Sequence, residues 1–264
     1  MIVDKNIDGG KAFDWGRASE DYAKYRDIYP VEFYEYLLGQ NLCTKGQKVL
    51  DIGTGTGVIP RNMYRFGAKF TGTDISDNQI EQARRLSAEA GMEIEYFCSP
   101  AEDMEFADES FDVVTACQCF TYFDHPVLAP KLSRMLKAGG RFAVLYMAWL
   151  PNEDSIAGAS EQLVLNYNPK WTGCGETRHP IQVPETYDRY FEVESSDVFD
   201  VHVPFTRESW NGRMKACRGI GASLAGDEVA AFEREHLEWL GEHAAETFEI
   251  LHYAAVTVLR KKQK

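Results

Sequence analysis

The chain of 264 residues contains no run that approaches the ~20 consecutive apolar residues needed to span a bilayer. Residues 1–13 mix charged and polar side chains and lack the apolar core, roughly 7–15 residues long, of a secretory signal. We therefore expect a cytoplasmic protein that does not bind membranes.

Basic residues are few: 28 Lys and Arg stand against 41 Asp and Glu, which gives a formal net charge of -13. Such a charge repels a phosphate backbone unless a basic patch offsets it. The basic cluster in the sequence is the C-terminal tail at 260–264, and such tails are usually solvated. The composition therefore argues against nucleic acid as a partner.

Paired cysteines are also absent. The six cysteines form no CxxC motif. Cys117 and Cys119 are separated by one residue at the end of a predicted strand, but no second pair at zinc-binding spacing follows them. We expect reduced thiols in a reducing compartment and no metal site.

Apolar runs rich in Val, Ile and Phe alternate with helical periodicity through residues 1–150. This pattern predicts strands joined by crossover helices in a parallel sheet. The predicted strands are 48–52, 69–73, 93–98, 111–116 and 141–147, and the predicted helices are 58–66, 76–91 and 127–136, the last closed by Gly139 and Gly140.

The pattern changes after Pro151. Pro, Asn, Gly and Trp dominate up to Pro184, and no helix or strand is predicted there. Strands at 191–203, helices at 208–220 and 227–240, and a final strand at 251–259 follow. We predict a core with an N-terminal lid helix over 1–150, and a cap or substrate region with the last strands over 151–264, within one integrated domain.

A glycine stands at every second position after the first predicted strand: Gly53, Gly55 and Gly57 follow Asp51. Glycines allow a tight turn and let a ligand contact backbone amides at the carboxyl edge of the sheet. Asp74 ends the second predicted strand, where a carboxylate can accept both hydroxyl protons of a ribose. A structural turn and a helix-capping aspartate are the alternative interpretations.

The nicotinamide-binding fingerprint GxGxxG is absent, because the third glycine comes one position too early and residue 58 is Val. No clear Tyr-x-x-x-Lys pair is present either. An NAD-dependent oxidoreductase is therefore the weaker interpretation of this loop.

Several linked motifs resemble the class I S-adenosylmethionine-dependent methyltransferases over residues 22–147: DxGxGxG from Asp51, GTD at 72–74, AEDMEFADESFDVV at 101–114 and LKAGG at 136–140. The later segment SWNGR at 209–213 is loosely similar to small-molecule methyltransferases of the trans-aconitate type. The resemblance implies a doubly wound, Rossmann-like α/β fold. It has a mostly parallel seven-stranded sheet, helices on both faces, an antiparallel last strand and a C-terminal cap insertion.

The resemblance also implies which residues hold S-adenosylmethionine. The glycine loop, with Thr54 inside it, packs beneath the methionine part, Asp51 lies near the amino group, and Asp74 holds the ribose hydroxyls. Arg26 pairs with the carboxylate of the cofactor. The other implied contacts are Ile75 beside the adenine, Ala101 and Glu102 at its edge, Cys117 and Gln118 along the methionine chain, and Tyr22, Tyr25 and Arg26 on an N-terminal helix that closes over the cofactor; a surface amphipathic helix is the alternative.

Methyl transfer from a sulfonium is an in-line displacement, so the protein has mainly to hold donor and acceptor together and exclude water. A base helps when the acceptor is a hydroxyl or a protonated amine. His125 is the candidate base, because it follows the fourth predicted strand on the side where this fold binds its substrate. A surface position is the alternative interpretation.

Contacts with the substrate are predicted among aromatic and arginine side chains. Aromatic rings exclude water and attract a sulfonium by cation–π interaction, and arginine binds a carboxylate through two parallel bonds. Packing within the cap and solvation are the alternatives. The candidates are Tyr122, Trp149, Trp171, Trp210, Arg213 and Arg218.

The sequence thus predicts an S-adenosylmethionine-dependent methyltransferase with a small-molecule acceptor, active as a monomer or homodimer. The alternatives are an NAD-dependent oxidoreductase and a non-catalytic protein that binds S-adenosylmethionine.

Overall fold

The computed structural model describes residues 3, 5–14, 24, 25 and 27–263. The chain divides into two compact units. The core unit comprises residues 31–147, 179–199 and 254–264, and the cap unit comprises residues 1–30, 148–178 and 200–253.

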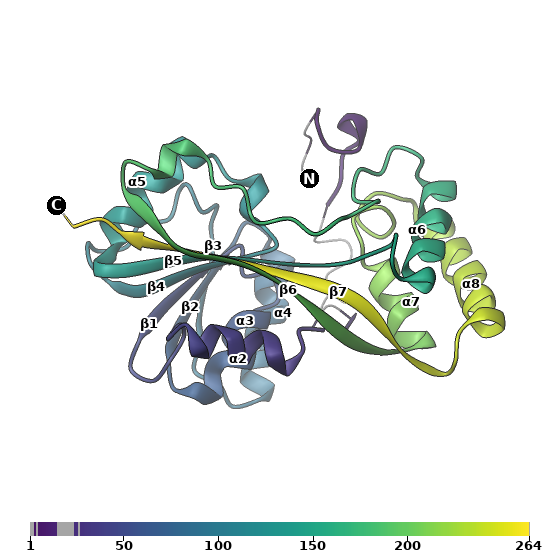
Figure 1. Ribbon diagram of the computed structural model, residues 1–264, viewed down its shortest axis with the longest axis horizontal. Coiled ribbons are helices and arrows are strands. Elements are labelled where there is room, and N and C mark those ends of the chain that lie inside the picture. The colour runs from purple at the N-terminus through teal and green to yellow at the C-terminus, as the bar shows by residue number, and fades with distance from the viewer. Residues whose placement is uncertain (1–2, 4, 15–23, 26, 264) are drawn as a thin grey trace. The chain divides into compact units, whose positions relative to one another are not determined.

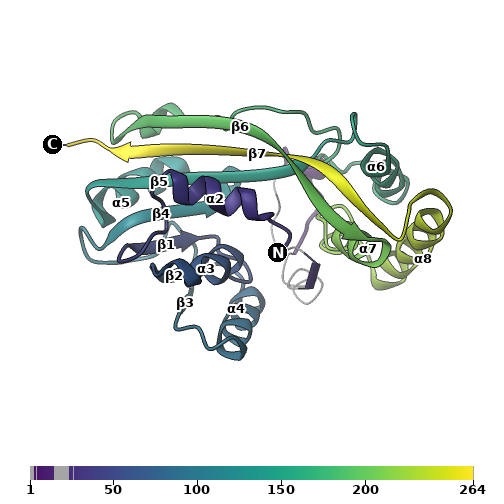
Figure 2. The same ribbon diagram turned by 60° about the horizontal axis from the view of Figure 1, so that its bottom comes forward.

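Seven strands form one sheet in the order β3-β2-β1-β4-β5-β7-β6. Neighbouring strands from β3 to β5 pair in parallel. In contrast, β7 runs antiparallel to β6 (Figure 2). The Lys262 N–H donates to the Tyr190 carbonyl just beyond one end of this pair, and the Ser196 and Thr257 hydroxyls meet further along it. The predicted mostly parallel seven-stranded sheet with an antiparallel last strand is confirmed. The strands are β1 (Lys48–Ile52), β2 (Lys69–Asp74), β3 (Glu95–Cys98), β4 (Phe111–Cys117), β5 (Leu136–Trp149), β6 (Phe191–Thr206) and β7 (Thr247–Lys261).

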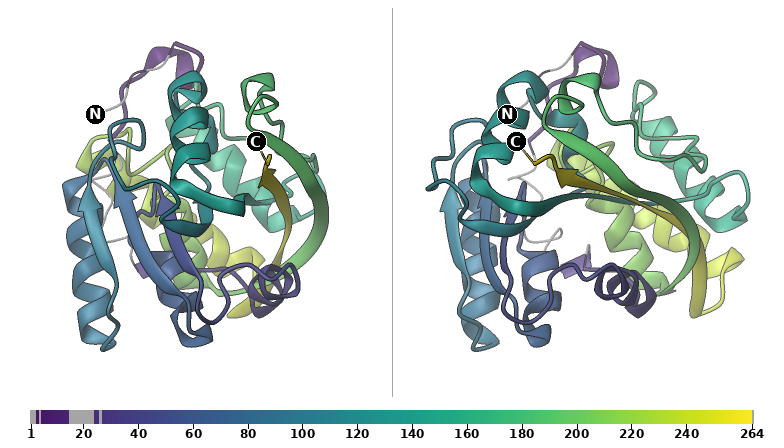
Figure 3. Two further views of the ribbon diagram at one scale, coloured as in Figure 1. Left: turned by 90° about the vertical axis from the view of Figure 1, so that its left-hand side faces the viewer. Right: turned by 60° about the vertical axis from the view of Figure 1, so that its left-hand side comes forward.

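Helices cover both faces of the parallel strands. Figure 1 shows α5 (His125–Met135) on one face and α2 (Val31–Gly39), α3 (Val58–Met63) and α4 (Asp77–Glu89) on the other, and Figure 3 gives the same packing from the side. No described helix has the length and apolarity to cross a membrane. Short 3-10 turns lie at Asp8–Gly10, Tyr64–Phe66, Phe120–Tyr122 and Glu185–Tyr187.

Local signals explain how the helices between the first strands begin and end. The Ser76 side chain accepts a hydrogen bond from the Gln79 N–H and caps α4, as its sequence predicts. Ile80 and Ala83 then face the sheet and pack against Tyr96 of β3. Gly67, at a φ of 85°, closes the turn after α3 in the left-handed region that favours glycine.

The main core lies between the sheet and α5. Leu50, Val114 and Phe142 from three parallel strands are buried against Leu128 and Leu132 of the helix. Burying each such side chain stabilises the fold by roughly 1.5–3 kcal/mol. This packing holds the carboxyl ends of β1 and β4 side by side.

The predictions around β5 and directly after it are partly wrong. The helix predicted at 127–136 begins at His125 and ends at Met135. Gly139 and Gly140 do not close it, because β5 already begins at Leu136 and contains both glycines. In addition, α6 (Ser155–Tyr167) fills part of the segment for which no helix is predicted. Its N-terminus is capped by Asp154, but its buried face includes Ser160, which weakens the apolar periodicity.

A buried polar chain joins the helices of the cap unit, where α8 (Gly226–His243) packs against α6 and α7 (Arg207–Lys215). The His236 Nε2 lies 2.9 Å from Ser160 Oγ, and its Nδ1 lies 2.9 Å from Asn211 Oδ1. Burial lowers the pKa of His236 to about 4. The ring is therefore neutral in the folded protein at neutral pH.

This burial predicts a pH-dependent stability. An unfolded histidine binds a proton below about pH 6.5, whereas folded His236 binds one only near pH 4, so stability falls as the pH drops through this window. Between pH 7 and pH 5, the free energy of unfolding of the wild type should fall by about 2 kcal/mol more than that of His236→Gln, measured by urea unfolding. His243→Gln, at an exposed position, is the control. An equal fall in the free energy of unfolding for the wild type and His236→Gln between pH 7 and pH 5 would contradict the lowered pKa of His236.

Candidate functional site

The turn that leaves β1 has left-handed backbone at three glycines, with φ of 63° at Gly53, 57° at Gly55 and 74° at Gly57. A β-carbon at Gly53 would lie 2.6 Å from Cys119 Sγ, and one at Gly57 would overlap the Tyr96 hydroxyl. Two of the three glycines therefore make room for protein side chains that pack against the turn.

Asp51 lies at the end of β1 and is 1% exposed. Its two oxygens accept hydroxyl protons from Thr54, at 2.6 Å, and from Thr115, at 2.5 Å. Burial raises the pKa of Asp51 to about 6, the two hydroxyl bonds oppose this shift, and the nearby Asp74 carboxylate adds to it. Asp51 thus ties the glycine turn to β4, and its predicted contact with the amino group of the cofactor stays a prediction.

The Asp74 carboxylate, at the end of β2, is turned towards the glycine turn. Its Oδ2 accepts the Gly55 N–H at 2.9 Å and its Oδ1 accepts the Ser76 N–H at 2.9 Å. A carboxylate has about four lone-pair positions, so each oxygen can accept a further hydroxyl. Burial raises the pKa of Asp74, and the backbone N–H bonds oppose the rise. Ile75, which follows it, is 64% exposed.

The end of β4 holds a non-glycine residue in the left-handed region. Gln118 has a φ of 65°, its N–H bonds the Leu145 carbonyl, and its side-chain amide donates to the Met147 carbonyl at 2.5 Å. Such backbone strain persists only where neighbours hold it, and it gathers at functional sites.

The two cysteines at this end of β4 flank Gln118. Cys119 contacts the glycine turn through Gly53, and burial raises the pKa of its thiol well above the ordinary value. Cys117 is the last residue of β4 and is partly buried. Cys119 is therefore a neutral packing group under the turn.

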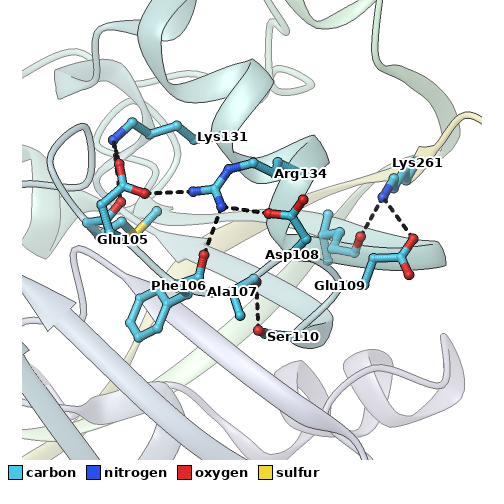
Figure 4. Close-up of polar contacts among 11 residues, drawn as sticks. Glu105, Phe106, Ala107, Asp108, Glu109, Ser110, Lys131, Arg134 and Lys261 are labelled. Atoms are coloured by element: carbon cyan, nitrogen blue, oxygen red, sulfur yellow. Dashed lines mark hydrogen bonds and ion pairs between the residues drawn. The ribbon is translucent and has the colours of Figure 1, made fainter.

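The connection from β3 to β4 is held against α5 by ion pairs. Arg134 donates to Glu105 at 2.8 Å, to Asp108 at 2.7 Å and to the Phe106 carbonyl at 2.9 Å, and Lys131 donates to Glu105 at 2.7 Å (Figure 4). These charges are mostly exposed, so each pair contributes little to stability on its own. Together they fix the path of the connection.

Two candidate residues lie at the start of this connection. Ala101 is buried in the main core, and the Glu102 carboxylate accepts the Asp124 N–H at 2.7 Å, just before α5. Glu102 therefore joins the β3–β4 connection to the segment that follows β4. Both residues belong to the same end of the sheet as Asp74.

Known proteins are similar to this chain in sequence and in fold. A family model described as "Methyltransferase domain" matches residues 50–144. The ubiquinone biosynthesis O-methyltransferase of Pseudomonas savastanoi pv. phaseolicola is 30% identical over 160 residues, which cover 60% of this chain and 68% of the relative. The enzyme of the same name from Cereibacter sphaeroides is 30% identical over 168 residues, 63% of this chain and 67% of the relative.

The chain belongs to the class I S-adenosylmethionine-dependent methyltransferases. It is an enzyme that transfers a methyl group from S-adenosylmethionine to a small molecule, which excludes the NAD-dependent alternative. The YcgJ protein from Bacillus subtilis shares the fold, with a TM-score of 0.53, 19% identity and coverage of 89% of this chain and 100% of that one.

In this methyltransferase His125 begins α5 and is partly buried. Its ring centroid lies 4.6 Å from that of Phe120, and its Nδ1 lies 3.2 Å from the Tyr187 hydroxyl. Burial lowers the pKa of His125, although the Asp124 and Glu102 carboxylates act in the opposite direction. The imidazole is therefore neutral at pH 7. Tyr122, in the 3-10 turn just before, is also partly buried.

The cap unit of the methyltransferase brings three of the predicted acceptor residues together. The Trp149 and Trp210 rings meet edge to face at 5.6 Å, and the Arg213 guanidinium carbon lies 4.7 Å from the centre of the Trp149 ring. The Trp149 Nε1 donates to the buried Glu161 at 2.5 Å. Stacking on an aromatic face suits the planar guanidinium of arginine.

Two other predicted acceptor residues do not join this cluster through any described contact. Arg218 donates to both oxygens of the fully buried Asp8, at 2.9 and 3.2 Å, and to Thr172. This pair ties the N-terminal segment to the rest of the cap unit, and the predicted substrate contact of Arg218 stays a prediction. Trp171 is 4% exposed and packs over Gly219.

The predicted lid helix is described only in part. The Tyr25 hydroxyl donates to Glu208 at 3.3 Å, and its ring lies so close to Gly212 that a β-carbon there would overlap it. Gly212 of α7 thus makes room for Tyr25. Tyr22 and Arg26 lie outside the described residues.

Sequence reasoning missed Thr115, Tyr96 and Tyr187. Each contacts a predicted site residue, but Thr115 reaches Asp51 across the sheet from 64 residues away, and Tyr187 reaches His125 from 62 residues away. A strand threonine and a tyrosine in a loop carry no sequence signal for these contacts. The glycine at position 57 was the one available hint of a large neighbour.

The packing of Tyr96 under the turn can be tested with two glycines. Gly57→Ala and Gly46→Ala both place a side chain at positive φ, which costs about 1–2 kcal/mol, but Gly46 has open space around it. Gly57→Ala should be destabilised by roughly 1–3 kcal/mol more than Gly46→Ala in urea unfolding, because it overlaps Tyr96. Equal losses would show that Tyr96 does not pack as described.

Proposed function

We propose that the glycine turn and Asp74 bind S-adenosylmethionine and that the enzyme methylates an oxygen atom of a small molecule. The observation that carries the first part is the orientation of the Asp74 carboxylate. It accepts the Gly55 N–H at 2.9 Å and keeps lone pairs for the two hydroxyls of a ribose.

The other cofactor contacts follow the same edge of the sheet. Ile75, Ala101 and Glu102 border the adenine, and Thr54 and Asp51 hold the turn beneath the methionine part. Cys117 and Gln118 lie along the methionine chain. From the N-terminal segment, Tyr22, Tyr25 and Arg26 complete the set.

The proposed acceptor atom is an oxygen, which the names of the 30% identical relatives support. The chemistry supplied by bound S-adenosylmethionine is an electrophilic methyl group, so the protein has to align an acceptor with it and exclude water. The proposed acceptor contacts are Tyr122, Trp149, Trp171, Trp210, Arg213 and Arg218.

We place the enzyme in the cytoplasm, as a monomer or homodimer that does not bind nucleic acid. None of the six cysteines, all of which lie among the described residues, is paired in a disulfide, which suits a reducing compartment. The net charge of -13 opposes binding to a phosphate backbone.

The ribose assignment predicts the effect of removing the Asp74 charge. Asp74→Asn should weaken S-adenosylmethionine binding by roughly 1.5–3 kcal/mol in isothermal titration calorimetry, because a charged hydrogen-bond acceptor is lost. Asp77→Asn removes an exposed carboxylate from the start of α4 and should leave the affinity unchanged. An unchanged affinity for Asp74→Asn would refute the assignment.

The acceptor proposal predicts which compounds are methylated. With S-adenosylmethionine present, phenols, catechols and carboxylic acids should yield S-adenosylhomocysteine and an O-methyl product, both detected by mass spectrometry. Cofactor at ~100 times its dissociation constant should also stabilise the fold by about 2.7 kcal/mol. Methylation of amines or thiols alone would show that the acceptor atom is not oxygen.

A further inference from the structure

The side chain of Tyr187 meets His125, the candidate base, inside the core unit. We infer that Tyr187 donates its hydroxyl proton to His125 Nδ1 and so fixes the imidazole with its proton on Nε2. His125 then presents a hydrogen-bond donor to the acceptor and does not remove a proton from it. This inference rests on the proposed function and on the sequence-based prediction that His125 lies on the side of the sheet where the acceptor binds.

The Tyr187 hydroxyl has no access to water. The side chain is 1% exposed, and its ring lies 5.6 Å from Phe120, 5.9 Å from Phe142 and 6.0 Å from Phe191. Burial raises the pKa of Tyr187, so the hydroxyl keeps its proton. A buried O–H needs an acceptor, because leaving it without one costs the loss of its hydration.

His125 is the acceptor within reach. Across the described residues, the hydroxyl of Tyr187 makes its single hydrogen bond with His125 Nδ1, at 3.2 Å. If Nδ1 carried the proton instead, it would donate to the tyrosine oxygen, and the tyrosine O–H would point into the aromatic cluster with no acceptor. With the proton on Nε2, the tyrosine O–H and Nδ1 are both hydrogen-bonded. With the proton on Nδ1, the tyrosine O–H has no acceptor.

The protonation state of the ring fits this arrangement. The charges of the Asp124 and Glu102 carboxylates favour the charged form of His125, but burial outweighs them and lowers its pKa. A neutral imidazole carries one N–H, so an accepting Nδ1 leaves the proton on Nε2. In this state Nε2 can donate to an oxygen but cannot take a proton from a hydroxyl.

The class of acceptor follows from this donor. An oxygen that carries negative charge before the reaction, as in a carboxylate or phenolate, accepts the Nε2–H bond and needs no base for methyl transfer. A neutral alcohol would need a base, which this tautomer does not supply. We therefore assign to His125 the binding of an oxyanion and to Tyr187 the role of positioning residue.

The tautomer is measured directly by long-range ¹H–¹⁵N correlation NMR on the uniformly ¹⁵N-labelled full chain. The ring signals that are absent from the spectrum of His125→Gln identify His125 among the six histidines. We expect Nε2 protonated and Nδ1 unprotonated at neutral pH. A protonated Nδ1 would overturn the inference.

The same spectra of Tyr187→Phe give a second test, because this variant removes the donor that holds Nδ1 as an acceptor. Its loss should lower the ratio of the Nε2-protonated to the Nδ1-protonated ring at neutral pH by roughly 2- to 10-fold. An unchanged ratio contradicts the inference.

Tyr190→Phe is the matched control, because it removes a hydroxyl from the same segment, and no described hydrogen bond joins Tyr190 to His125. It should leave the tautomer ratio of His125 as in the wild type, and a matching change in this variant would overturn the inference by showing a general effect of packing. The measurements need no cofactor or acceptor. Failure of the proposed function, seen as absent S-adenosylmethionine binding in calorimetry, is thus distinguished from failure of the tautomer assignment.

Discussion

The hydrogen bond from the Gly55 N–H to the Asp74 carboxylate is the interaction on which the site depends, because it joins the ends of two adjacent strands. Next to this bond, the Asp51 carboxylate accepts hydrogen bonds from the Thr54 and Thr115 hydroxyls and so fixes the turn to β4. These bonds anchor a turn in which three glycines have left-handed backbone. Anchoring a loop before a ligand binds lowers the entropic cost of binding.

Burial sets the charge of the groups around this turn. It raises the pKa of the Asp51 and Asp74 carboxyls and of the Cys119 thiol, and it lowers the pKa of His125. Each group is thereby moved towards its neutral form, because a low-dielectric interior disfavours charge. Such surroundings suit the proposed reaction, in which the positive sulfonium and a negatively charged oxygen of the acceptor become two neutral products, because a low-dielectric site disfavours the separated charges.

The cap unit uses buried polar groups in a different way. The chain from Asn211 through His236 to Ser160 joins three helices, and the Asp8–Arg218 pair joins the N-terminal segment to them. A buried polar group without its partner is costly, so these bonds favour one arrangement of the helices over others that would bury the same apolar area. The cluster of Trp149, Trp210 and Arg213 lies in the same unit as these hydrogen-bonded helices.

The order of motifs determined the sheet, the glycine turn, the Ser76 cap and the carboxylate at the end of β2, because each of these is encoded by residues that are neighbours in the chain. The missed helix α6 shows the limit of such local signals, since polar residues occupy part of its buried face. Only the tertiary structure decided that Thr115 holds Asp51, that Arg218 pairs with Asp8 and that Tyr187 meets His125. These pairs are separated by 62 residues or more, and which distant side chains meet is set by the packing of strands and helices that local sequence does not describe.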